Sequence, residues 1–295
     1  MATRGLPRTF ELSVRVPGSS GDVAPAVIDR NNALKNSGSH HILLLVHGYN
    51  NSHDVAEASY GKFLENFQAQ LGGSLDAPDA IAKFHWPGDE STFFGSTVGY
   101  AFDINHARDA AQRLATYLAG LPIPGTASLR ITIVGHSMGC RLILEALGRM
   151  PNALGISLVG LMAAASPIEF VKRGGRLFRT GNLPRRMLKF FSEQDSVLQF
   201  GFPLGQWHAF QMQIEDDNYF EAVGRHGNPN EFGSPFPTEN GHSKYWSDRS
   251  IAAIMVRQID ATIPAPIPVA AVPARELPPA TEFAARSLPR RTLPR

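Results

Sequence analysis

The hydrophobic and polar positions along the chain alternate between a strand pattern and a helix pattern. The continuous apolar run at residues 42–46 (ILLLV) is typical of a strand buried on both faces of a parallel sheet. Residues 54–71 place apolar side chains at helical spacing, with Asp54 as a candidate N-cap. Further strands are predicted at 10–16, 81–86, 129–134, 156–165, 187–191 and 211–215, helices at 103–119, 140–150 and 245–260, and a loop up to about residue 39. This order predicts a doubly wound, mostly parallel α/β sheet with helices on both faces.

The composition changes near residue 263. From there prolines recur among alanines and arginines, a composition that cannot continue a packed core. We therefore expect an α/β domain over residues 1–262 and an extended or disordered tail over residues 263–295.

Length, charge and cysteine content restrict the class of protein. The 295 residues are 43% hydrophobic, enough for a sizeable core, and the formal net charge of +2 gives no electrostatic case for nucleic acid. The single cysteine, Cys140, excludes an intrachain disulfide and suits a reducing compartment. Residues 1–10 lack the apolar core of a signal peptide, and no apolar run approaches the roughly 20 residues of a membrane helix. These features predict a soluble, cytoplasmic protein without a transmembrane segment.

The sequence Gly-His-Ser-Met-Gly at 135–139 is the main candidate for chemistry. It follows the strand-like run 129–134 (LRITIV) and precedes a helical pattern, which is the context of a nucleophile elbow. In such a turn Ser137 takes a strained conformation, and Gly135 and Gly139 leave room where a Cβ would clash. The alternative is a strand–turn–helix junction with an incidental serine, and we favour Ser137 as a nucleophile.

Acyl transfer also needs two backbone N–H donors that face the developing oxyanion. One donor is normally the residue after the nucleophile, here Met138. The other comes from the loop after an earlier strand, where His47 and Gly48 lead to Tyr49. Gly48 would allow close backbone approach, so the Tyr49 amide is the second candidate donor.

Several segments together resemble one known family. VHGYNNSHDVA, FHWPGD, GYAFDINHARDAAQRLATYL and VGHSMGCRL are similar to a largely bacterial α/β-hydrolase family of unknown function. Its members carry H-G-Y-N after the first buried strand, a W-P-[SG] turn and an H-S-M-G elbow. The chain is also broadly similar to lipases and carboxylesterases. The resemblance covers about residues 40–250 and implies the fold and a serine mechanism, but no particular substrate.

A catalytic serine needs a base, and the base needs an acid that orients it. In the α/β-hydrolase chain order the acid follows the serine and lies just beyond a strand. The predicted strand 187–191 is followed by Ser-Glu-Gln-Asp, so Asp195 is favoured as the acid and Glu193 is its rival. The resembled family also has an Asp at this place. The competing interpretation is that Asp195 only caps the next helical segment.

The base must be a histidine that follows Asp195 in the chain. His208, His226 and His242 meet this condition, and His242 is favoured because it directly precedes the terminal helix, as the family resemblance also implies. His226 stays open as an alternative. His136 adjoins the serine in sequence and is interpreted as shaping the pocket or packing.

The sequence therefore predicts a serine hydrolase that cleaves a small-molecule carboxylic ester without a cofactor. Acyl transfer, thioester hydrolysis or peptide cleavage by the same triad are alternatives, and so is an interaction protein that keeps the fold without the chemistry. No His, Cys or Asp cluster has metal-ligand spacing, so no metal is expected. Residues 168–186, which include a basic run, lie where this fold often carries a lid, although a solvated loop is the simpler interpretation. The oligomeric state is open.

Overall fold

The computed structural model describes residues 7–19, 21–72, 77–88, 96–123, 128–150 and 155–261. The tail expected at 263–295 lies outside these described residues. The helices and strands follow in the order β1 (Arg8–Arg15), β2 (Val23–Asp29), β3 (His41–Val46), α1 (His53–Leu71), β4 (Ala80–His85), α2 (Ser96–Ala119), β5 (Arg130–His136), α3 (Met138–Arg149), β6 (Ile156–Met162), α4 (Ile168–Val171), β7 (Arg186–Phe191), α5 (Phe202–Gln211), α6 (Val223–His226), β8 (Ser234–Pro237) and α7 (Arg249–Asp260).

The described strands form one eight-stranded sheet in the order β2-β1-β4-β3-β5-β6-β7-β8. Only β1 and β2 pair in antiparallel fashion, and the other neighbouring pairs are parallel. Every residue of β3 is buried, as the continuous apolar run predicted. The predicted fold class, a doubly wound and mostly parallel α/β sheet, is confirmed.

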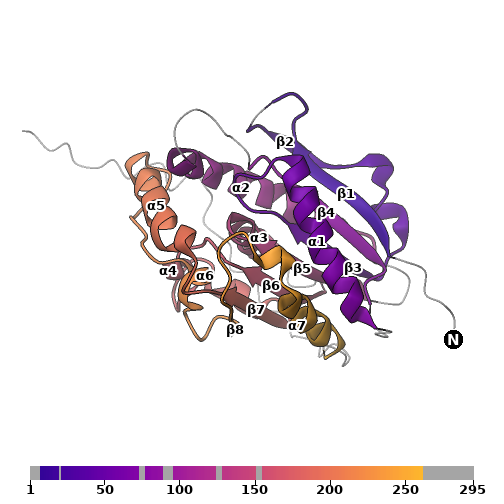
Figure 1. The fold of residues 1–295 in the computed structure, drawn as a ribbon. Coiled ribbons are helices and arrows are strands. Elements are labelled where there is room, and N and C mark those ends of the chain that lie inside the picture. Colours follow the sequence, from indigo (N-terminus) through magenta and orange to yellow (C-terminus); the bar gives the residue numbers. More distant parts are fainter. Residues whose placement is uncertain are drawn as a thin grey trace, which may run out of the picture. The chain divides into compact units, whose positions relative to one another are not determined.

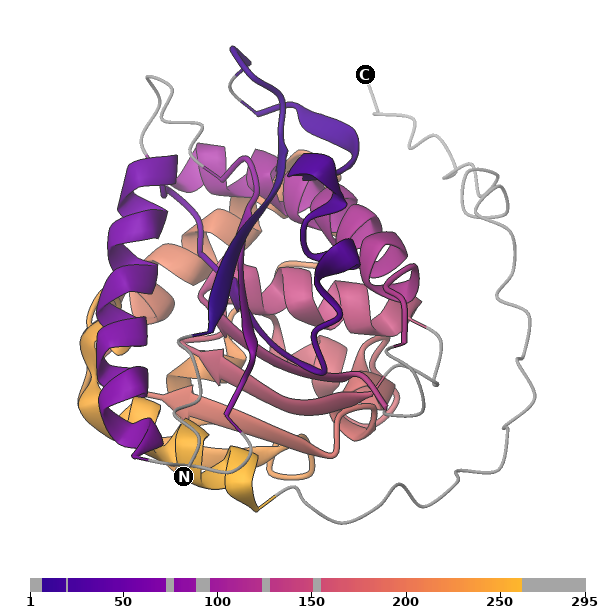
Figure 2. The same ribbon diagram turned by 90° about the vertical axis from the view of Figure 1, so that its right-hand side faces the viewer.

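Helices cover both faces of the sheet (Figures 1 and 2). Helices α1 and α7 pack together on one face, and α2 and α3 pack together on the other, with α5 against α2. Helix α1 begins one residue before Asp54, because the Ser52 side chain accepts a hydrogen bond from the Val55 amide at 3.3 Å. The N-cap is therefore Ser52 and not Asp54. The inward face of α1 buries Tyr60 and Phe63 against the sheet.

Two strands were not predicted from the sequence, and both contain proline. β2 includes Pro25 within the stretch expected to be loop, and β8 includes Pro235 and Pro237. Both strands lie at the edges of the sheet. A proline cannot donate to a central ladder but is tolerated on an edge strand.

The strand predicted at 211–215 is wrong. Residues 202–211 form α5, and the chain reverses at Gln213, which has a positive φ of 59°. Phe202 and Ala209 are buried at helical separation, as the inward face of a helix requires. No helix among the described residues combines the length and apolar character that crossing a bilayer requires.

Candidate active site

Ser137 lies on a sharp turn between β5 and α3, at the carboxyl edge of the sheet. Its backbone has φ 53° and ψ −124°, a conformation that costs a non-glycine residue about 1–3 kcal/mol and needs surrounding structure to hold it. That support comes from β6 and the residues just after it, because the Ser137 amide donates to the Met162 carbonyl at 2.9 Å and the Ser137 carbonyl accepts from the Ala165 amide at 3.1 Å.

The two glycines around Ser137 lie where the neighbouring structure leaves little room for a side chain. A Cβ on Gly139 would lie 2.2 Å from the His47 carbonyl oxygen at the end of β3. A Cβ on Gly135 would lie 2.3 Å from the Ile143 side chain on α3. Because real Cβ contacts are much longer and the His47 carbonyl belongs to the backbone, Gly139 is needed for α3 to pack this closely on the sheet, whereas a Cβ at Gly135 requires a shift of the Ile143 side chain.

The structure brings Ser137, His242 and Asp195 into one hydrogen-bonded chain. His242 Nε2 lies 3.0 Å from Ser137 Oγ, and His242 Nδ1 lies 2.8 Å from Asp195 Oδ2. Asp195 is fully buried, and its second oxygen accepts a hydrogen bond from the Leu198 amide at 3.0 Å. The carboxylate thus also caps the turn that follows it. This holds it in one orientation toward the imidazole.

The rival acid and base lie elsewhere and contact each other. His226 ends the short helix α6, and its Nδ1 lies 3.5 Å from Glu193 Oε1. Both side chains are well exposed, at 42% and 72%. His208 lies within α5, where its ring contacts Trp207. Of these histidines, His242 is the one with a hydrogen bond to Ser137 in the described part of the chain.

The loop after β3 lies directly against the nucleophile. A Cβ on Gly48 would come within 2.9 Å of Ser137 Cβ, so only glycine lets this backbone approach so closely. This contact brings the segment with Tyr49 beside Ser137. Met138 is the first residue of α3, where helix geometry leaves backbone N–H groups without intrahelical acceptors.

A network of buried side chains fixes the loop that contains Gly48. The His47 ring stacks on Trp86, with ring centroids 5.6 Å apart, and burial holds the His47 pKa well below its ordinary value. The neutral ring can donate from Nδ1 to the Gly48 carbonyl at 2.9 Å and accept at Nε2 from the Trp86 amide at 3.3 Å. Tyr60 on α1 adds a hydroxyl 2.8 Å from the His47 amide. The role of Tyr60 had no signal in the sequence, since it occupies an ordinary inward-facing helix position.

His136 contacts the backbone of His242, the candidate base. Its Nε2 lies 2.7 Å from the main-chain carbonyl oxygen of His242. Burial and the nearby His242 lower the His136 pKa to about 3, so the ring is neutral near pH 7 and donates this hydrogen bond. His136 therefore fixes the backbone that presents His242.

Ser137 and His242 open into a cavity of about 610 Å³, within the size range of small-molecule sites. Its walls come from the loop after β3, α1, α2, the turn Val197–Gly201, the start of α5 and the loop of His242. Tyr100, Leu198, Phe202 and Trp246 supply apolar surface, while Asn50, Asn51 and Lys62 supply polar groups. No residue of 168–186 is among the described lining residues, so the lid expected there stays a prediction.

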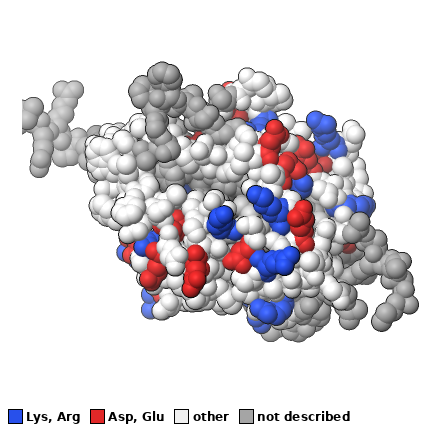
Figure 3. All heavy atoms as spheres, viewed as in Figure 1, with Lys and Arg blue, Asp and Glu red and all other residues white. Residues whose placement is uncertain are grey.

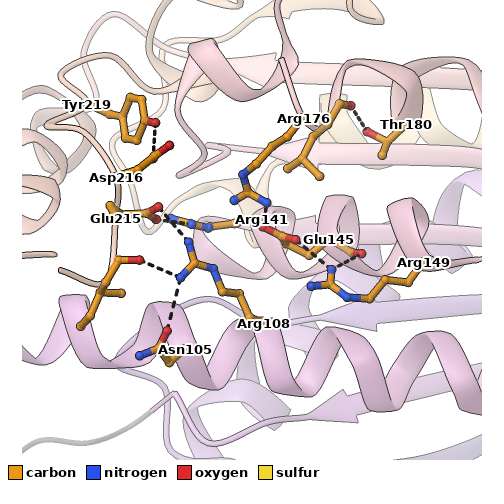
Figure 4. A network of polar contacts seen from close by, with 12 residues as sticks. Asn105, Arg108, Arg141, Glu145, Arg149, Arg176, Thr180, Glu215, Asp216 and Tyr219 are labelled. Atoms are coloured by element: carbon orange, nitrogen blue, oxygen red, sulfur yellow. Dashed lines mark hydrogen bonds and ion pairs between the residues drawn. The ribbon is translucent and has the colours of Figure 1, made fainter. Parts of the chain in front are cut away.

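A buried ion-pair network lies behind this wall, around α3 (Figure 4). Arg141 on α3 and Glu215, just after α5, form an ion pair and are almost fully buried. Arg108 on α2 pairs with the other oxygen of Glu215 at 2.8 Å, and Glu145 on α3 pairs with Arg149 and with Arg176. Glu215 follows α5 in the chain, so the network joins the segment after α5 to helices α2 and α3. No local sequence pattern indicated this network, because its members are far apart in the chain.

An eight-stranded, mostly parallel sheet with helices on both faces fits the α/β-hydrolase fold. The chain belongs to the family described as "Alpha/beta hydrolase of unknown function (DUF900)", whose model matches residues 26–206, more than half of the 295 residues. The family resemblance inferred from the sequence is thereby confirmed.

Solved structures of hydrolases resemble the chain at low sequence identity. The ydeN gene product of B. subtilis is 13% identical, with 75% of this chain and 98% of that chain covered and a TM-score of 0.40. A methylesterase from Arabidopsis is 14% identical, with 75% and 99% covered and a TM-score of 0.39. An esterase from Pyrobaculum calidifontis is 14% identical, with 76% and 75% covered and a TM-score of 0.39. Among curated proteins, none matches the sequence. Values this low say nothing about the substrate of this chain.

Proposed function

We propose that this chain is a serine hydrolase that cleaves carboxylic esters through a Ser137–His242–Asp195 triad and an acyl-enzyme intermediate. The observation that carries the proposal is the hydrogen-bonded chain from Ser137 Oγ to His242 Nε2 at 3.0 Å and from His242 Nδ1 to Asp195 Oδ2 at 2.8 Å. The base and its orienting acid lie within hydrogen-bond reach of a serine on a strained turn, which is the arrangement that nucleophilic acyl transfer needs.

The proposed reaction proceeds in two halves. His242 Nε2 takes the proton from Ser137 Oγ as the oxygen attacks the ester carbonyl, and the Met138 and Tyr49 amides stabilise the oxyanion. The tetrahedral intermediate collapses to the acyl-enzyme, and His242 gives its proton to the departing alkoxide. Water then loses a proton to His242 and attacks the acyl-enzyme. The carboxylic acid leaves, and the proton returns to Ser137.

The protein environment supports each role in this scheme. Asp195 would accept the Nδ1–H of His242, fix the tautomer and stabilise the imidazolium. Because Asp195 is fully buried, water weakens this interaction little. The apolar side chains of Leu198, Phe202 and Tyr100 offer a surface for the acyl portion of the substrate. The reaction uses no cofactor.

The test is the turnover of a p-nitrophenyl ester series, from acetate to long acyl chains, by the wild type and by Ser137→Ala. We expect the wild type to turn over and the variant to lose kcat by about 10⁴-fold or more, since removal of a triad nucleophile leaves only residual catalysis. His242→Ala should lose a similar factor, and the matched variant His226→Ala should keep its activity. Equal turnover by wild type and Ser137→Ala would disprove the role of Ser137.

A fluorophosphonate probe separates the remaining alternatives. If no ester is hydrolysed but the probe labels Ser137, as mapped by mass spectrometry, the triad is active on another acyl substrate or in acyl transfer. If the probe labels nothing, the fold serves binding without this chemistry. Both results would reject the ester proposal, and only the second would reject the triad.

A further inference from the structure

Glu11, His53 and His85 form a second cluster of chemically active side chains, separate from the residues around Ser137. Each offers one ligand atom, and these atoms lie within 4.8 Å of one another. The parallel pairing of β1 with β4 sets Ser13 opposite His85, two residues beyond Glu11. His53, the first residue of α1, lies against His85 with ring centroids 4.3 Å apart. We propose that this cluster binds a divalent transition metal ion, of which Zn²⁺ is the best match.

The ligand chemistry fits this ion. Two imidazoles and one carboxylate are ligands that Zn²⁺ accepts at about 2.0–2.2 Å, and two such ligands at a tetrahedral angle lie about 3.3 Å apart. Glu11 Oε1 and His53 Nε2 already lie 3.4 Å apart. Both side chains are about half exposed, so small rotations can draw the three ligand atoms together around an ion.

Each histidine also has the carboxylate partner that metal-bound histidines usually have. His85 Nε2 lies 3.0 Å from Glu57 Oε1, and His53 Nδ1 lies 3.4 Å from Asp54 Oδ1. Such contacts fix the tautomer and leave the other ring nitrogen unprotonated for the metal. The second oxygen of Glu57 pairs with Lys83 at 2.5 Å, which holds that carboxylate in place.

The buried ring of His85 is the strongest evidence for a bound ion, because one of its nitrogens has no partner in the described part of the chain. Its side chain is fully buried, and its Nδ1 has no hydrogen-bond partner among the described residues. A buried polar atom without a partner is costly, and a bound ion would satisfy it.

The surroundings leave the site accessible. Glu11 and His53 line a cavity of about 400 Å³ that also has Arg15 and Arg30 in its wall and none of the residues around Ser137. A fourth metal ligand, such as water, can enter from this side. The metal would join β1, β4 and the start of α1, close in sequence to the loop that contains Tyr49. The proposal does not rest on the proposed esterase activity.

The test uses the untagged full-length chain after chelator treatment, titrated with Zn²⁺ in competition with a chromophoric chelator and with Co²⁺ by absorption spectroscopy. We expect one equivalent of metal per chain and visible d–d bands of four-coordinate Co²⁺. His53→Ala and Glu11→Ala change exposed side chains and should lose most of the affinity. Glu57→Gln should weaken binding about 10–100-fold, the usual effect of removing a partner of a ligand.

His40→Ala is the matched control, because His40 is an exposed histidine that also faces a carboxylate, Asp79, at 3.6 Å. It should bind Zn²⁺ as the wild type does. The proposal is overturned if the wild type binds no stoichiometric metal, or if His53→Ala and Glu11→Ala bind as tightly as wild type and His40→Ala. Thermal unfolding of each metal-free variant confirms that it is folded before titration.

Discussion

At the scale of single residues, the candidate site depends on side chains that are buried and held in one protonation state. His47 and His136 flank the nucleophile, and burial lowers the pKa of both. Each uses its neutral ring to hold a main-chain carbonyl, that of Gly48 or that of His242. The hydrogen bonds of these rings therefore place the backbone of the proposed oxyanion loop and the proposed base.

The pKa of His136 makes a prediction about acid stability. A histidine whose pKa is about 3 in the folded chain and about 6.5 in the unfolded chain takes up its proton on unfolding between these values. Its contribution to stability is complete above pH 6.5 and is lost as the pH falls through that window, by up to about 1.4 kcal/mol per pH unit. When the pH is lowered from 7 to 4.5, the free energy of unfolding should therefore fall less in His136→Gln than in the wild type.

Urea unfolding at the two pH values measures this difference. The exposed His226, replaced as His226→Gln, is the matched control and should keep the wild-type pH dependence. An unchanged pH dependence in His136→Gln would show that this ring does not titrate far below its ordinary value.

At the scale of elements, buried ion pairs hold α5, which forms part of the cavity wall, against α2 and α3. Phe202 at the start of α5 lines the cavity, and Glu215, just after α5, pairs with Arg108 on α2 and Arg141 on α3. The Ile214 carbonyl accepts a further hydrogen bond from Arg108 at 2.9 Å. The end of α5 is thus attached to the helix that begins at the nucleophile, and a change in this network is expected to reach the cavity.

Removal of one partner from this network should be costly. Arg141 and Glu215 have side chains only 0% and 2% exposed, so Glu215→Gln would leave a buried guanidinium without its countercharge. We expect a loss of about 3–5 kcal/mol in the free energy of unfolding, measured by urea denaturation. The exposed Asp217, replaced as Asp217→Asn, should change it by less than about 0.5 kcal/mol.

A double variant shows whether the charge itself is the cause. Arg141→Met combined with Glu215→Gln removes both buried charges and should be less destabilised than Glu215→Gln alone. If the double variant is as unstable as the sum of both single changes, packing and not charge explains the loss.

At the scale of the whole molecule, the parallel sheet collects the candidate residues at one edge. The loops after β3, β5 and β7 carry Tyr49, Ser137 and Asp195, and the loop before α7 brings His242 to them.

On the face drawn in Figure 3 acidic and basic side chains are interspersed, in keeping with the small net charge of +2. Long-range attraction of a highly charged partner to that face is therefore weak.

The described residues that form this edge and the core all precede residue 262. We therefore expect a chain that ends at residue 262 to keep the kcat and KM of the full-length protein in the ester assay. A chain that ends at residue 247 is the contrasting variant. It lacks α7, whose Met255 is fully buried and lies against Gly160 of β6, and should fail to fold. A large loss of kcat in the longer truncation would contradict the proposed domain boundary.

The sequence alone determined the fold class and the candidate nucleophile. Both follow from local patterns: strand and helix periods alternate along the chain, and Gly135-His136-Ser137-Met138-Gly139 joins a buried strand to a helix. Prediction from local pattern failed at the two proline-containing edge strands and at α5. There, the position in the sheet and packing against α2 decided the structure.

Only the tertiary structure decided which distant side chains meet. It brought His242 and Asp195 to Ser137, while His226 and Glu193 met each other, and it gathered Glu11, His53 and His85, whose separation in the sequence hid them. The physical reason is that strand register, helix packing and loop paths set distances between residues far apart in the chain. Periodicity constrains which face a side chain occupies, but not which partner lies opposite it.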